Sequence, residues 1–230
     1  NLGAQNLTVY KDYDNTNFGS GNAFNARAGV SGTGQIVGNG ASQTLTGNVT
    51  STGANTWNLN LGNVRGGTVG QASFQVQNNG TGTDIRGALQ TGANGASITD
   101  TRLSGITAGN FGPIVAGGSS GNFTVTLAAG ATGGNLSGQT LAVASNFSNV
   151  STQTITLNGF SSVLAQGSIT PSGSPTAVNL GNFRVGSTGA NSAFAASNST
   201  TGAGAERLGI DSVNASAEQL RAQLALAGLQ

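Results

Sequence analysis

The chain contains no cysteine, no histidine and no methionine among its 230 residues. Without cysteine it has neither a disulfide framework nor a thiolate nucleophile. Without histidine it lacks the base of Ser-His-Asp and Cys-His catalysis and the usual ligand of zinc sites. These absences exclude a disulfide-stapled domain and many enzyme classes, and we predict a non-enzymatic protein with no catalytic residue and no resident cofactor.

Charged residues are also scarce, at 7% of the chain against about 25% in typical soluble domains. The net charge is +1, and the 8 lysines and arginines are scattered singly, which predicts no nucleic-acid partner. No apolar run reaches the roughly 18 residues of a spanning helix, so no membrane-spanning segment is predicted. A nearly neutral surface rich in amides and hydroxyls fits a molecule packed into an assembly, although a secreted protein hydrated by those groups is an open alternative.

The chain is instead rich in glycine, with 39 residues, and in asparagine, serine and threonine. Short alternating runs separated by Gly- and Asn-rich turns are typical of β-strands, so the expected fold class is all-β. The candidate strands between residues 57 and 159 are 57–64, 71–78, 86–90, 96–101, 121–127, 139–145 and 153–157. This number of short strands in about 100 residues predicts an immunoglobulin-like β-sandwich. Its predicted core residues are Phe74, Val76, Phe123, Val125 and Leu127.

One phrase occurs twice, as Asn60–Thr68 and again as Asn179–Ser187, at a constant offset of 119 residues (61 to 180). A repeat of this length predicts tandem β modules rather than a solenoid. We therefore predict a complete immunoglobulin-like module at 57–159, a linker at 160–175 and a partial second module at 176–230. Ser216, Leu220, Leu224 and Gly228 predict a short helix in the tail of that second module.

The residues before the first module divide into two parts. Residues 1–13 contain an alternating segment around Leu7 and Val9 that matches the pattern of 149–157, so they are predicted to be the closing strand of a preceding or neighbouring module. Residues 14–56 are interpreted as a Gly/Asn-rich insert with short strands near 35–37 and 43–49.

The module opening carries a resemblance to a known family. Leu59–Thr68, followed by Phe74–Asn79, resembles bacterial choice-of-anchor D repeats, which are immunoglobulin-like modules akin to ASH-type domains. Val178–Val185 keeps the same pattern in the second copy. The resemblance implies exported surface or matrix proteins and brings no catalytic residues.

The two incomplete ends suggest how such a chain would assemble. We predict that Leu2, Leu7 and Val9 form a donated strand and that Leu180, Phe183 and Phe194 line its acceptor in another copy. The predicted function is a structural subunit of an extracellular bacterial fibre, sheath or surface matrix, with copies of itself as partners. A trimmed stretch of a longer repeat protein explains the same ends without strand exchange.

A second hypothesis is a surface adhesin or carbohydrate-binding module. Its candidate glycan platform consists of four aromatic residues near the N-terminus, which are Tyr10, Tyr13, Phe18 and Phe24. Asp12 and Asp14 are candidate calcium ligands, and a solvated Asx-rich turn is the alternative interpretation. Asp84 and Asp100 are interpreted as ion partners of Arg86 and Arg102 rather than as a catalytic pair.

Overall fold

The computed structural model describes residues 3–13, 33–130, 132–170 and 195–209. These residues form strands, turns and loops and contain no helix, so the all-β prediction is confirmed for them. No helix long and apolar enough to cross a membrane occurs among them. The chain divides into two compact units, one of residues 1–164 and 202–205 and the other of residues 165–201 and 206–230. The second copy of the repeated phrase and the predicted helix over 216–228 lie outside the described residues.

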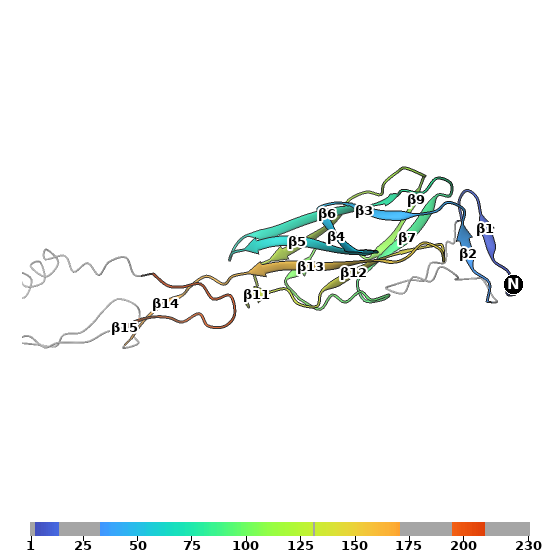
Figure 1. Ribbon diagram of the computed structural model, residues 1–230. Coiled ribbons are helices and arrows are strands. Elements are labelled where there is room, and N and C mark those ends of the chain that lie inside the picture. The colour runs from blue at the N-terminus through green and yellow to red at the C-terminus, as the bar shows by residue number, and fades with distance from the viewer. Residues whose placement is uncertain (1–2, 14–32, 131, 171–194, 210–230) are drawn as a thin grey trace, which may run out of the picture. The chain divides into compact units, whose positions relative to one another are not determined.

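The first unit is built on two sheets that lie one over the other (Figure 1). The four-stranded sheet has the order β3-β6-β10-β8, and the larger sheet has the order β4-β5-β13-β12-β7-β9 with β11 also paired to β13. The first sheet consists of β3 (Gln43–Gly47), β6 (Val69–Asn78), β8 (Leu103–Ser104) and β10 (Phe123–Ala128). The second consists of β4 (Val49–Gly53), β5 (Thr56–Val64), β7 (Ile85–Gln90), β9 (Gly109–Ile114), β11 (Gly134–Asn135), β12 (Thr140–Ser145) and β13 (Gln153–Ser161).

The core lies between these two sheets and follows from strand alternation. Along β6 and β10 every second side chain points inward, and Phe74, Val76, Val125 and Leu127 are at most 1% exposed. The larger sheet faces them with buried side chains such as Leu59. Four predicted core residues are therefore confirmed as fully buried, and the fifth, Phe123, is partly buried and packs against the same cluster.

The first copy of the repeated phrase forms the corner where the chain leaves β5 for β6. Opposite β13, β5 carries an extra residue, and Gly62 adopts a φ of +76° there while the Asn60 side chain accepts a hydrogen bond from its amide at 2.9 Å. Thr68 then closes the turn, because its Oγ1 donates to the Arg65 carbonyl and accepts from the Arg65 amide. The phrase is thus a bulge followed by a tight turn.

Residues 43–53, interpreted from the sequence as part of an insert, supply one edge strand to each sheet. β3 pairs with β6 and β4 pairs with β5. The chain changes sheets within one residue, because Gly47 adopts a φ of +103° and Asn48 bonds Ser73 through both its amide and its Oδ1. The β-sheet region therefore begins before residue 57.

The N-terminal strand β1 (Leu7–Val9) pairs in parallel with β2 (Ile36–Gly38) of the same chain. Two asparagines from the connection between β12 and β13 anchor this pair, since Asn149 bonds the Gly38 backbone twice and Asn146 donates to the Tyr13 carbonyl. In the second unit, β14 (Gly167–Thr170) pairs with β15 (Ala195–Asn198) in an antiparallel arrangement. β14 lies within the predicted linker at 160–175.

Candidate functional site

The candidate calcium residue Asp12 is engaged by an arginine. Its two carboxylate oxygens accept hydrogen bonds from Arg86 Nε at 2.9 Å and Nη2 at 2.8 Å. These hydrogen bonds lower the pKa of Asp12 and keep it ionised. Asp14 lies outside the described residues, which contain no cluster of three or more acidic, histidine or cysteine side chains around a metal position.

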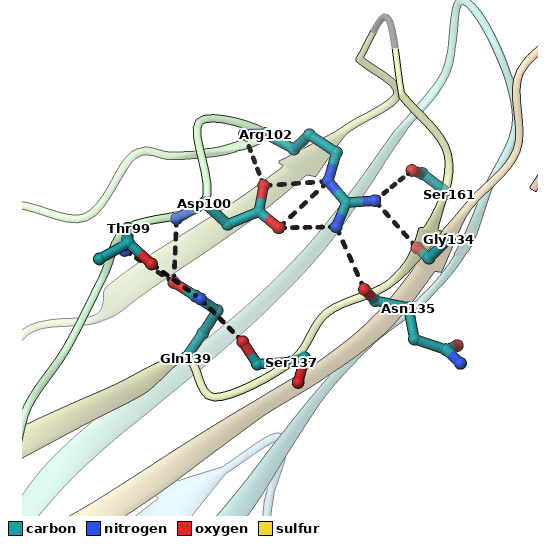
Figure 2. Close-up of polar contacts among 8 residues, drawn as sticks. All are labelled: Thr99, Asp100, Arg102, Gly134, Asn135, Ser137, Gln139 and Ser161. Carbon is teal, nitrogen blue, oxygen red and sulfur yellow. Dashed lines mark hydrogen bonds and ion pairs between the residues drawn. The ribbon is translucent and has the colours of Figure 1, made fainter. Parts of the chain in front are cut away.

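A dense cluster of polar contacts surrounds Arg102 (Figure 2). Its guanidinium binds Asp100 through Nε and Nη2, at 2.9 and 2.6 Å, as the sequence predicted for this pair. The remaining N–H groups donate to the Gly134 carbonyl, the Ser161 hydroxyl and the Asn135 carbonyl. Hydrogen bonds from Arg102 lower the pKa of Asp100, and those to Asp100 raise the pKa of Arg102.

A buried amide holds the backbone that presents Asp100. Gln139 is 5% exposed, and its Oε1 accepts from the backbone amides of Thr99 and Asp100 at 2.8 and 3.0 Å. Its Nε2 donates to the Ser137 carbonyl and to Thr99 Oγ1. We call Asp100, Arg102 and Gln139 the clasp, because they tie the start of β8 to β11 and the end of β13. Since its donors are all occupied within the protein, the clasp stabilises the fold rather than receiving a ligand.

A cleft opens between β9 and β10, at one side of the two sheets. It consists of two adjoining hollows of about 350 and 450 Å³ that share Asn110, Asn122 and Phe123 in their linings. The cleft exists because β8 ends at Ser104, where Gly105 turns the chain away with a φ of +75°. β8 therefore covers only the Thr126–Leu127 part of β10 and leaves Phe123 at the opening.

The aromatic lining of the cleft is fixed by packing. Phe123 stacks on buried Phe74, with ring centroids 5.4 Å apart, and meets Phe111 edge to face at 6.1 Å. The Phe111 ring lies over Gly87 of the neighbouring strand, where a Cβ would meet it at 2.5 Å. The side chains of Asn110 and Asn122 are exposed and form no hydrogen bond with any described residue.

On the opposite side of the sheets, β4 presents an open edge. The strand reads Val-Thr-Ser-Thr-Gly, has no charge and no proline, and pairs only with β5 within the described part of the chain. The edge strand β9 is different, because it contains Pro113 and carries Gly112 at a φ of +98°. Both edge strands have an irregular register with their neighbour, β4 between Ser51 and Gly53 and β9 opposite β7. A proline in an edge strand hinders strand addition, whereas an edge without charge or proline leaves it available.

The structure places only some of the predicted assembly residues. Leu7 is 38% exposed and Val9 packs partly against the core, and both lie in β1 beside β2 of their own chain. Leu2 and the acceptor residues Leu180, Phe183 and Phe194 lie outside the described residues, so the donated strand stays a prediction. In the predicted aromatic platform Tyr10 is 72% exposed and Tyr13 packs against the core, while Phe18 and Phe24 are likewise not described.

The cleft was not predicted from the sequence, because no strand was predicted at the position of β9. Gly109-Asn110-Phe111-Gly112-Pro113 has the composition of a turn, and only Phe111 signals a buried position. Proline is tolerated in an edge strand, where its missing N–H faces away from the sheet.

Comparison with known proteins gives little further information. No protein-family model matches the chain, and no curated protein matches it. Among solved structures it is similar to a protein of unknown function from Porphyromonas gingivalis W83, at 12% identity and a TM-score of 0.33. The match covers 54% of this chain and 52% of that one, so the chain spans about half the length of that protein.

Proposed function

We propose that this chain is a non-enzymatic structural subunit of an extracellular bacterial fibre, sheath or surface matrix, and that copies assemble through their strand edges. The observation that carries the proposal is the open edge of β4, which is uncharged, free of proline and paired on one side only within the described residues. The charge-poor composition supports the proposal, because close packing of neutral surfaces involves little loss of charge hydration.

The strand order supports an immunoglobulin-like interpretation of the module. If β3, β6, β8 and β10 are strands A, B, D and E, the smaller sheet has the A-B-E-D order of that fold. If β7, β12 and β13 are C, F and G, the larger sheet contains the G-F-C order with β9 following C. This topology agrees with the resemblance to choice-of-anchor D repeats, whose members are exported surface proteins.

The β4 edge suits addition of a strand from a second copy. Thr50, Ser51 and Thr52 are all exposed, so an incoming strand meets hydroxyl and methyl groups rather than charge. The N-terminal strand is a less accessible donor, because the Val9 carbonyl accepts from both the Asn39 amide and Thr83 Oγ1. Donation of residues 1–10 to another copy requires these hydrogen bonds to the Val9 carbonyl to break. Addition of a strand at β4 does not.

The test is assembly of the full chain with lysines placed on the open edge. We expect Thr50→Lys/Thr52→Lys to remain monomeric in sedimentation velocity at concentrations where the wild type polymerises, because charged side chains on an edge prevent edge-to-edge pairing. Ala116→Lys/Ser137→Lys is the matched control, since it adds the same charge at exposed turn and loop positions and should polymerise normally.

Two results would overturn this proposal. A wild-type chain that stays monomeric at every accessible concentration removes the structural-subunit function. A wild type that polymerises equally well with the β4 lysines removes the role of the β4 edge. In that case a chain lacking residues 1–10 tests whether these residues act as the donated strand. Loss of polymerisation would support strand donation, and unchanged polymerisation would exclude it.

A further inference from the structure

We propose that the cleft between β9 and β10 is a binding site for a neutral saccharide. The inference is independent of assembly, because the cleft lies at the β8–β9 side of the sheets and the open edge of β4 at the other. A site of this kind would add recognition of a glycan surface to a structural role.

The size and lining of the cleft define the chemical class of its ligand. Its two hollows, of about 350 and 450 Å³, fall in the range of small-molecule sites, which is roughly 300–1,000 Å³. No lysine, arginine, aspartate or glutamate is among the residues that line them. A charged ligand would lose hydration there without gaining a counter-ion, so the cleft favours a neutral one.

The polar groups of the cleft fit hydroxyl groups. Each asparagine amide offers two N–H donors and a carbonyl acceptor, and those of Asn110 and Asn122 are unused by the described part of the protein. A hydroxyl group both donates and accepts, so one amide can bind two neighbouring hydroxyls of a sugar. Asn110 lies in β9, and Asn122 immediately precedes the first residue of β10.

The apolar part of the cleft fits the C–H face of a sugar ring. Phe111 and Phe123 are each partly exposed and are held at a fixed angle of 72° by their edge-to-face contact. The stacking of Phe123 on Phe74 prevents its ring from collapsing into the opening. The aromatic surface is therefore preorganised, so little side-chain entropy is lost when a ligand binds.

The experiment is glycan-array binding by the full chain, followed by calorimetry with the neutral oligosaccharide that binds best. We expect Asn110→Ala/Asn122→Ala to weaken binding about tenfold or more, because each amide loses hydrogen bonds to the ligand. The matched control is Asn63→Ala/Asn135→Ala, which removes two exposed amides outside the cleft and should leave affinity unchanged. Binding should also be insensitive to salt, since no charge lines the site.

Three outcomes would overturn the assignment: no binding to any neutral glycan, equal weakening by the cleft and control variants, or a strict requirement for an acidic sugar. Phe111→Ala provides a second variant that alters the cleft without removing an amide, and circular dichroism shows whether it is folded. Repeating the titration with Thr50→Lys/Thr52→Lys separates the two proposals, because glycan binding should survive when assembly is lost.

Discussion

The two sides of the stacked sheets end in different ways. On one side, a single segment, residues 43–53, forms the edge of both sheets as β3 and β4, with no charge and no proline. On the other, β8 has two residues, β9 contains Pro113 and Gly112 at a positive φ, and the clasp secures the start of β8. We call these the open side and the closed side. The difference indicates that strand addition is prevented on one side and left available on the other.

The closed side contains the less exposed of the two ion pairs described above. The clasp ion pair is largely buried, with side-chain exposures of 9% for Arg102 and 17% for Asp100. The open side relies on backbone pairing and on hydroxyl contacts such as Thr52 to Thr56 at 3.2 Å. Substitutions on the closed side should therefore affect the stability of the fold, whereas those on the open side should affect association.

The largest loss of folding stability is expected for Arg102→Ala. The change leaves Asp100 without its partner in a mostly buried position and frees the carbonyls of Gly134 and Asn135. We expect the free energy of unfolding to fall by about 3 kcal/mol or more, the usual cost of removing one partner of a buried pair. Urea denaturation measures it. A loss below about 1 kcal/mol would show that the closed side does not depend on the clasp.

The second-largest loss of folding stability is expected for Gly87→Ala in β7. A Cβ at this position would lie 2.1 Å from the Ala144 carbonyl oxygen and 2.5 Å from the Phe111 ring. Overpacking of this kind costs about 1–3 kcal/mol, and it should also move Phe111 in the cleft. On the open side, Gly53→Ala meets only the rotatable Thr56 hydroxyl, at 2.9 Å, and should change stability by less than about 0.5 kcal/mol. Thermal unfolding of both variants tests the contrast.

The clasp should make the stability of the fold depend on pH. Since hydrogen bonds from Arg102 lower the folded-state pKa of Asp100, the pair stabilises the fold fully above the ordinary aspartate pKa of about 3.9. That stabilisation is lost as the pH falls through the lowered folded-state pKa. Asp100→Asn should make the decline in stability below about pH 4 shallower, which urea titrations at a series of pH values can measure. An unchanged acid profile would contradict this assignment.

Much of the fold follows from strand alternation, and its exceptions have identifiable causes. β5, β6, β7, β10, β12 and β13 all coincide closely with predicted strands. Alternation is clearest in β6, β10 and β13, whereas the side chains of β7 and β12 are buried along almost their whole length. Residues 96–101 were wrongly predicted as a strand, since their polar groups bond Gln139 and Thr140 instead of forming a continuous ladder. The contacts of Arg102 with residues 134–161 depend on how the chain returns through β11 and β13, which local sequence patterns do not specify.

The smallest effect is expected for Asp12→Asn, which weakens the more exposed ion pair. Asp12 is 30% exposed and Arg86 is 17% exposed, so solvent screens their attraction more than that of the clasp. We expect a loss of about 0.5 kcal/mol, measured by urea denaturation beside Arg102→Ala. Added calcium should leave the wild-type midpoint unchanged, because both carboxylate oxygens of Asp12 already bind Arg86. A calcium-dependent rise that Asp12→Asn abolishes would instead show that the cation displaces the arginine, and that the N-terminal segment is a ligand site.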